Sequence, residues 1–290
     1  MKGFAKKLLV NSLWGLLGRR NLVRFSRFLA NESRLDVRNE MTSNGELLIQ
    51  QIVLKQLVAG ESKPIVFDVG ANVGEWSRNF MAECRRGGIT PELHLFEPSR
   101  VTFETLKSKL AEWNLTDKAV LNNLALSSGS GTRVFYSVGD NCGRNGLYPI
   151  DGEARTSETV TASTIDEYCG AHAVDSIAFL KIDTEGHDLE VIYGATGKLK
   201  EAKIRCIQFE YNQRWIDARH YLRDAFGFLN PLGYVIGKIT PLGVEFYEGW
   251  DMELETYREA NYISLRESDK AFFPQIKWWN AAGKDGRAAN

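Results

Sequence analysis

The chain has 290 residues, of which 43% are hydrophobic and 25% are charged, as is typical of a globular protein. Its net charge of −1 gives no general basic field, so we expect no nucleic-acid partner. No run of 18 apolar residues occurs, which argues against a transmembrane helix. The four cysteines share no C-x-x-C spacing, which favours reduced intracellular thiols over a disulfide framework or a zinc site. We predict a helical extension at residues 1–43, one catalytic domain at 44–267 and an aromatic tail at 268–290.

The first 28 residues mix basic and apolar side chains, and the first acidic residue is Glu32. This composition predicts a basic amphipathic helix or a pair of helices. The apolar face would either pack on the domain that follows or lie on an anionic membrane surface. A cleaved signal is a third alternative, although Asn11 and Ser12 interrupt its apolar core. A cytoplasmic location is expected, with attachment to the inner membrane face if the second alternative holds.

A strand, a glycine turn and a helix follow one another from residue 65. The run 65–69 is apolar and β-branched, as in a buried parallel strand. Gly70 and Gly74 bracket the turn, where glycine allows positive φ and the close approach of a ligand. The stretch 75–86 is predicted to be helical, so the turn would present a ligand to a helix N-terminus.

The residues around this turn indicate which nucleotide binds. A second predicted strand, 93–96, ends in Glu97, where a carboxylate can accept both hydroxyls of a ribose. A dinucleotide fingerprint would need glycine at the positions of Asn72 and Glu75, so the pyrophosphate cradle is incomplete. Asp68 would repel a diphosphate but attract a cationic amino group. This charge arrangement suits S-adenosylmethionine and disfavours a nicotinamide dinucleotide.

The remaining elements extend the same alternation of strands and helices. Asn123 and Ala125 lie near the end of one predicted strand, where they would line an adenine pocket or form only a polar turn. The last two predicted strands would form a hairpin at the sheet edge. Helices are expected at 44–58, 99–113, 166–169 and 221–229, and strands at 119–126, 132–138, 159–165, 177–182, 204–209, 234–239, 244–247 and 262–265.

The segment 139–158 is polar and rich in glycine, without clear periodicity. Such a segment is long for a connection inside a compact domain, which favours a binding loop or lid. Asn141, Arg144 and Tyr148 would then contact a polar substrate. A plain surface loop is the alternative.

A second chemical cluster follows the apolar strand 177–182. Asp183, Glu185 and His187 would crowd the carboxyl edge of the sheet, beside the inferred sulfonium. The alternative is that Asp183 or Thr184 caps the next helix.

Four motifs stand out along the predicted domain: Phe67-Asp-Val-Gly-Ala-Asn-Val-Gly, Phe96-Glu-Pro, Asn123-Leu-Ala-Leu and Leu180-Lys-Ile-Asp-Thr-Glu-Gly-His-Asp-Leu-Glu-Val-Ile-Tyr-Gly-Ala. With these motifs, the sequence resembles the FkbM-type methyltransferases over residues 46–240. The resemblance implies a Rossmann-like class I methyltransferase fold, α/β, with a mostly parallel seven-stranded sheet and helices on both faces. It also implies that S-adenosylmethionine donates a methyl group to a sugar hydroxyl in a glycan, a polysaccharide or a glycosylated natural product.

The resemblance also assigns the cofactor contacts by position. Glu97 would bind the ribose, and Asn123 with Ala125 would flank the adenine. Asp183 is expected beside the reacting end of the cofactor on other grounds, namely its position at the carboxyl edge of the sheet. The methionine end would be held by Asp68, Gly70, Asn72 and Gly74.

Methyl transfer requires the acceptor hydroxyl to lose its proton. His187 is a candidate base because its ordinary pKa is near neutrality, but it would serve equally to orient Asp183. Asp183, Glu210 and Asn212 would alternatively form a magnesium site, or the carboxylates would bind the sugar hydroxyls directly. The rival from another class is a catalytically silent, cofactor-binding scaffold in a polysaccharide assembly system. The sugar and the oligomeric state are left open.

Overall fold

The computed structural model describes residues 2–36, 40–58, 60, 61, 63–150, 152, 153 and 155–281. The chain divides into two compact units, Met1–Arg38 and Asn39–Asn290. The first unit consists of α1 (Lys2–Ser33), in which Gly18 leaves the helical conformation with φ 71° and ψ 152°. None of the helices in the described ranges has both the length and the hydropathy needed to cross a bilayer.

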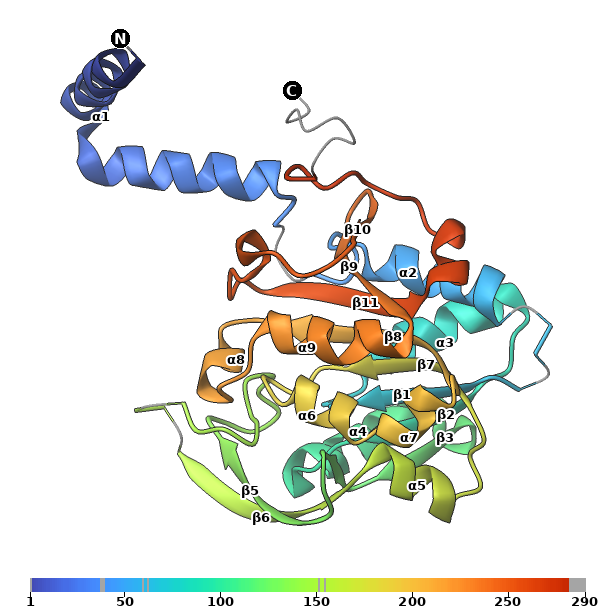
Figure 1. Cartoon of the computed structure of the whole chain (residues 1–290). Helices are drawn as coiled ribbons and strands as arrows, with labels where there is room; N and C mark the ends of the chain where they lie inside the picture. Colours follow the sequence, from blue (N-terminus) through green and yellow to red (C-terminus); the bar gives the residue numbers. More distant parts are fainter. Residues whose placement is uncertain are drawn as a thin grey trace. The chain divides into compact units, whose positions relative to one another are not determined.

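The second unit is built on a large mixed sheet (Figure 1). Among the described residues this sheet has eight strands, in the order β10-β9-β11-β8-β7-β1-β2-β3. The five strands from β8 to β3 are parallel, and the other three pair antiparallel. The mostly parallel sheet is therefore confirmed, and β10 adds an edge strand to the expected seven. The bounds are β1 (Ile65–Val69), β2 (Glu92–Phe96), β3 (Ala119–Asn122), β7 (Ile177–Ile182), β8 (Ile204–Tyr211), β9 (Tyr234–Thr240), β10 (Gly243–Tyr247) and β11 (Ala260–Arg266).

The edge hairpin differs from the prediction. β10 pairs with β9, and β11 lies between β9 and β8. The expected hairpin between 244–247 and 262–265 is therefore wrong. Only residues 241 and 242 separate β9 from β10, and a two-residue connection favours pairing of neighbours. The longer connection 248–259 allows β11 to return to β8.

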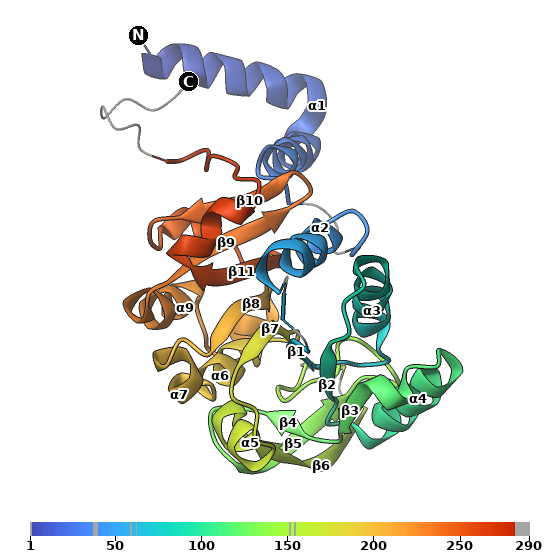
Figure 2. The ribbon, with the colours of Figure 1, turned by 90° about the vertical axis from the view of Figure 1, so that its right-hand side faces the viewer.

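Helices cover both faces of the sheet, as predicted (Figure 2). Successive side chains of a strand point to opposite faces, so each strand supplies two cores. Val66 packs in the core that contains Phe80, whereas Phe67 and Val69 pack in the core that contains Leu189. One face carries α2 (Glu46–Ile52), the π-helix η1 (Val53–Leu57), α3 (Glu75–Gly87) and α4 (Arg100–Glu112). The other carries α5 (Ile165–Ala171), α6 (Asp188–Tyr193), α7 (Thr196–Lys200) and α9 (Leu222–Leu229).

A small second sheet, in the order β4-β6-β5, follows β3. It consists of β4 (Ala125–Leu126), β5 (Gly131–Ser137) and β6 (Thr156–Ser163). The single strand expected at 119–126 is wrong, because the chain leaves the main sheet at Asn123. There the Asn123 Nδ2 donates to the carbonyl oxygens of Glu97 and Pro98, both at 2.9 Å, and Leu126 already pairs with Ser163.

The predicted aromatic tail packs on the second unit. Phe273 is buried in the core that contains Phe80, and Trp278 packs against Tyr247 with ring centroids 5.5 Å apart. Residues 282–290 of this tail lie outside the described residues.

Short helices complete the second unit. They are α8 (Arg214–Asp217), η2 (Thr116–Lys118), η3 (Asn230–Leu232), η4 (Met252–Leu254) and η5 (Glu267–Phe272).

Candidate active site

The turn after β1 brings two strand ends unusually close together. Gly70 has φ 79°, and a Cβ on it would lie 1.9 Å from the carbonyl oxygen of Asp183, so only glycine fits. Asn72 also has positive φ, at 47°, and it lines the pocket beyond the turn. Its Oδ1 is buried, and no hydrogen-bond donor within the described ranges reaches it. A buried oxygen in this state favours a ligand that donates a hydrogen bond.

Glu97 presents a fixed carboxylate to the same pocket. The backbone N–H of Asn72 donates to its Oε2 at 3.0 Å, and that of Ser99 donates to Oε1 at 2.9 Å. Burial raises the pKa of Glu97 to about 7, although these two hydrogen bonds act in the opposite direction. The carboxylate is thus held in place and changes its charge near neutral pH.

The pocket lies at the carboxyl ends of β1, β2 and β7 and holds about 560 Å³ of empty space, part of it open to solvent. Ligands of doubly wound sheets bind at this edge. One wall is apolar, which suits a purine ring. That wall contains Phe96, Leu124, Ala125, Leu126, Phe135 and Leu147.

Asp68 lies behind the pocket wall and is fully buried. It accepts a hydrogen bond from Ser77 Oγ at 2.6 Å, and its Oδ1 is 3.7 Å from Lys181 Nζ. Lys181 Nζ also donates to Asp183 Oδ2 at 3.0 Å. Burial raises the pKa of Asp68, whereas Lys181 acts against that shift. The positive charge of Lys181 therefore offsets the negative charges of two carboxylates, that of Asp68 behind the pocket and that of Asp183 in its wall.

Two other residues expected at the cofactor also support the pocket from outside. Gly74 begins α3, and a Cβ on it would lie 2.7 Å from Leu106 Cδ1, so its small size allows α3 and α4 to pack. Asn123 is exposed, and its side chain holds the turn after β2. The cofactor candidates that line the pocket are Gly70, Asn72, Glu97, Ala125 and Asp183.

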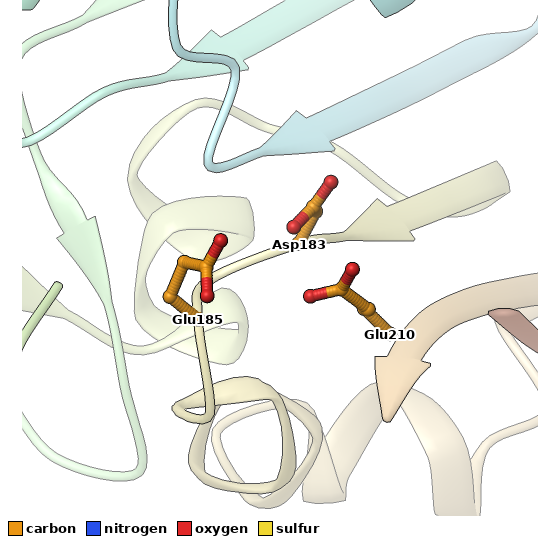
Figure 3. Close-up of side chains that lie close together, drawn as sticks. All are labelled: Asp183, Glu185 and Glu210. Carbon is orange, nitrogen blue, oxygen red and sulfur yellow. The ribbon is translucent and has the colours of Figure 1, made fainter. Parts of the chain in front are cut away.

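Three carboxylates converge beside this pocket (Figure 3), and two of them, those of Asp183 and Glu185, line it. One oxygen each of Asp183, Glu185 and Glu210 lies within 4.8 Å of the other two. Asp183 follows β7 and Glu210 is the next-to-last residue of β8, whereas Glu185 is in the loop before α6, with φ 55°. Burial and the charge of Asp183 raise the pKa of Glu185 to about 8 and that of Glu210 well above its ordinary range. The protonated forms of Glu185 and Glu210 are consequently favoured over those of ordinary exposed carboxyl groups.

Asp188 was not predicted as a site residue, but its carboxylate accepts hydrogen bonds from residues in and around this cluster. Its Oδ2 accepts hydrogen bonds from Thr184 Oγ1 and from the backbone N–H of Gly186, both at 3.2 Å. Its Oδ1 accepts the backbone N–H of Glu210, also at 3.2 Å. Burial raises the pKa of Asp188 to about 7.

Asn212, expected as a metal ligand, adjoins the cluster. Its Nδ2 donates to Glu210 Oε2 at 2.6 Å, and its Oδ1 accepts the backbone N–H of Arg214 at 2.8 Å. The amide oxygen is therefore already engaged at the start of α8. The carboxylate oxygens of Asp183, Glu185 and Glu210 are the donors in this cluster that suit a hard cation such as Mg²⁺.

His187 has a hydroxyl partner at each ring nitrogen. Nε2 lies 3.0 Å from Ser127 Oγ, and Nδ1 lies 3.0 Å from Tyr148 Oη. Burial lowers the pKa of His187 to about 4, so the imidazole is neutral at neutral pH. Since both nitrogens are engaged, an acceptor hydroxyl would have to displace one hydroxyl partner to reach this base.

The glycine-rich loop contributes to the pocket through residues other than those predicted. Arg144 is exposed and forms an ion pair with Glu153 at 2.7 Å, and Asn141 is also exposed. Tyr148 contacts His187 and accepts a hydrogen bond at its carbonyl oxygen from Arg214 Nη2 at 2.6 Å. The loop residues in the pocket wall are Cys142, Gly143, Asn145, Gly146 and Leu147.

Of the apolar wall, sequence reasoning predicted Ala125 but missed residues such as Leu124 and Phe135, which resemble ordinary core residues. For Leu124, its position next to Asn123 is the signal that could have indicated it.

A mostly parallel sheet covered on both faces, with a ligand pocket at the ends of β1, β2 and β7, defines a Rossmann-like fold of the class I methyltransferase type. The sequence model of the methyltransferase FkbM domain matches residues 68–261. The chain therefore belongs to the FkbM family of S-adenosylmethionine-type methyltransferases. A comparison with curated proteins gives no significant match.

Among solved structures, the chain is similar to the FkbM methyltransferase of Methylobacillus flagellatus KT, with 15% identity and a TM-score of 0.45. That match covers 73% of this chain and 47% of the other, so the chain spans about half the length of that protein. The N-terminal domain of human METTL16 matches at 9% identity over 76% of this chain and 67% of the other, with a TM-score of 0.42. Precorrin-6y C5,15-methyltransferase from Geobacter metallireducens matches at 11% identity over 75% of this chain and 86% of the other, with a TM-score of 0.39.

Proposed function

We propose that the chain transfers a methyl group from S-adenosylmethionine to a hydroxyl of a sugar, in a glycan, a polysaccharide or a glycosylated natural product. The observation that carries this proposal is the convergence of Glu210 with Asp183 and Glu185, which line the same pocket as Glu97. Carboxylates in such an arrangement can accept hydrogen bonds from several hydroxyls of one sugar and can take up a proton.

The pocket fits the cofactor in its chemistry. Glu97 would accept hydrogen bonds from ribose hydroxyls, and the apolar wall that includes Leu124 and Phe135 would contact the adenine. The buried Oδ1 of Asn72, which has no donor within the described part of the chain, would accept from the amino group at the methionine end. When bound, S-adenosylmethionine supplies a methyl group that is already activated by its positive sulfur.

The protein has to orient the acceptor hydroxyl and to receive its proton as the new C–O bond forms. The carboxylate cluster suits both roles, because burial and neighbouring negative charge favour proton uptake by Glu185 and Glu210. We assign the proton to this cluster as a unit, with Asp183 and Glu185 facing the pocket. His187 would remain neutral and hold Tyr148 in place.

The test is incubation of the protein with S-adenosylmethionine and a panel of nucleotide sugars and glycan fragments, with mass spectrometry of the products. We expect one sugar to gain a single methyl group, and Asp183→Asn to lower the rate at least 100-fold while adenosylhomocysteine still binds. Glu153→Gln, on the exposed side of the loop, is the matched control and should retain the wild-type rate.

Binding of adenosylhomocysteine without any methylated product, across sugars and lipid-linked glycans, would favour the silent scaffold instead. Methylation of an amine or a carboxylate would refute the assignment to a hydroxyl. The Mg²⁺ site stays a prediction, and activity that survives exhaustive chelation would eliminate it.

A further inference from the structure

The second half of α1 separates apolar from basic side chains by helical position. After the break at Gly18, residues 19–33 continue as helix. Leu22, Phe25 and Leu29 are spaced by three and four residues and therefore lie on one face, next to Phe28. The side chains of Phe25, Phe28 and Leu29 are 52%, 55% and 47% exposed.

The basic side chains of this half form a second stripe. Arg20, Arg24 and Arg27 are also spaced by four and three residues, so they share a face, on the opposite side of the helix from the apolar one. No acidic side chain interrupts this pattern before Glu32. An amphipathic helix with a basic polar face is the chemistry that recognises an anionic lipid surface.

The first half of α1 is richer in apolar residues. Leu8, Leu9 and Leu16 are exposed, and Lys6 and Lys7 lie beside them. The seven basic residues that precede Glu32 contrast with a net charge of −1 for the whole chain. Positive charge is thus concentrated in α1, together with exposed apolar side chains, whereas the rest of the chain carries a net negative charge.

We propose that α1 binds the surface of an anionic phospholipid bilayer. Phe25, Phe28 and Leu29 would enter the boundary between headgroups and acyl chains. Arg20, Arg24 and Arg27 would contact the lipid phosphates. The break at Gly18 divides α1 into two helical halves, each with apolar and basic side chains of its own. This inference stands on the residues of α1 and does not depend on the acceptor of the methyl group.

The test is co-sedimentation of the full chain with vesicles of phosphatidylcholine alone or mixed with phosphatidylglycerol. We expect binding to the mixed vesicles only, with loss of binding as the salt concentration rises. Replacing Arg20, Arg24 and Arg27 by glutamine should weaken binding roughly 100-fold, since each basic residue contributes separately. Replacing Phe25, Phe28 and Leu29 by serine should weaken it at least tenfold.

A matched control distinguishes vesicle binding through α1 from nonspecific binding through any exposed apolar side chain. Ile216, Leu242 and Met252 are also exposed apolar residues, but they belong to the second unit. Their joint replacement by serine should leave vesicle binding unchanged.

Three outcomes would overturn the proposal. In the first, the wild-type chain fails to bind mixed vesicles, or the control variant binds as weakly as the α1 variants. In the second, the Phe25, Phe28 and Leu29 variant lowers the melting temperature while vesicle binding is unchanged, which would mean that the apolar face packs on protein. In the third, the same variant converts a dimer to a monomer without any change in vesicle binding, which would assign the face to a second copy of the chain.

Discussion

The carboxylate of Asp188 accepts the backbone N–H of Glu210, with Oδ1 3.2 Å from the nitrogen. This contact joins the loop between β7 and α6 to the end of β8. The other oxygen of Asp188 accepts from Thr184 and Gly186, which flank Glu185. One buried side chain therefore holds the backbone at both Glu185 and Glu210.

We expect Asp188→Ala to lower both stability and turnover. The substitution would leave buried donors without partners, and each such donor costs about 1–3 kcal/mol. Urea denaturation should show a loss of about 3 kcal/mol, and kcat should fall at least tenfold with little change in KM for the cofactor. Asp251→Ala, which removes only an exposed cap on Glu253, is the control and should cost at most about 1 kcal/mol. Unchanged kcat in a folded Asp188→Ala protein would contradict the positioning role.

The affinity for adenosylhomocysteine should fall as the pH is lowered through about 7. Burial raises the pKa of Glu97 to about 7, so this residue gains a proton below that pH and loses acceptor strength for the ribose. Titration calorimetry between pH 6 and 8 should show the dissociation constant rising by up to about tenfold per unit below that pKa. Glu97→Gln should bind more weakly and with little dependence on pH, whereas the exposed Glu104→Gln should behave as wild type. A pH-independent wild-type affinity would argue against Glu97 as the ribose ligand.

Turnover should instead rise with pH up to about 8. The pKa of Glu185 is about 8 because of burial and the charges of Asp183 and Asp188, and the cluster must have lost a proton before it can accept one. The rate at saturating cofactor and acceptor, measured from pH 6 to 9, should therefore increase and then level off. In Glu185→Gln this rise should shift or disappear. If the variant kept the wild-type profile, another group would have to receive the proton.

Lys181→Met should destabilise the protein strongly. The substitution leaves the buried Asp68 and the half-buried Asp183 without their shared cation, and breaking a buried ion pair costs about 3–5 kcal/mol. Lys203→Met is the matched control, because Lys203 and Asp175 form an exposed pair whose loss should hardly move the urea midpoint. Equal midpoints for the two variants would show that Asp68 becomes protonated and needs no cation.

The parts of the fold that were predictable from sequence are those set by local pattern. The strand at 65–69 and the helix that begins at Glu75 were predicted at their observed starts, because glycines and a β-branched run mark them. The break at Asn123 and the place of β11 depend on distant contacts, namely those with Glu97, Pro98 and β8, so no local pattern indicated them.

The candidate site likewise contains residues that could be predicted from the sequence and residues whose role depends on distant contacts. Glu97 and Asp183 could be placed because strand ends at one sheet edge converge. Asp188 could not, because a carboxylate at the first position of a helix resembles ordinary capping until its partners at Gly186 and Glu210 are known. The engagement of both His187 nitrogens depends on Ser127 and Tyr148, which are remote in sequence.

The chain leaves the main sheet at Asn123, so the pocket lies between the main sheet and the small sheet. The two sheets differ in how much apolar surface they bury. Glu97 and Asp183 belong to the main sheet, whereas the wall at Ala125 and Phe135 belongs to the small sheet, whose own buried cluster is minor. Elements with little buried apolar surface open at low free-energy cost, so amides of β5 and β6 should exchange hydrogen faster than those of β1 and β7. Adenosylhomocysteine should slow that exchange. The cofactor could then enter and leave through transient opening of one wall, while the carboxylates that orient the acceptor stay in register.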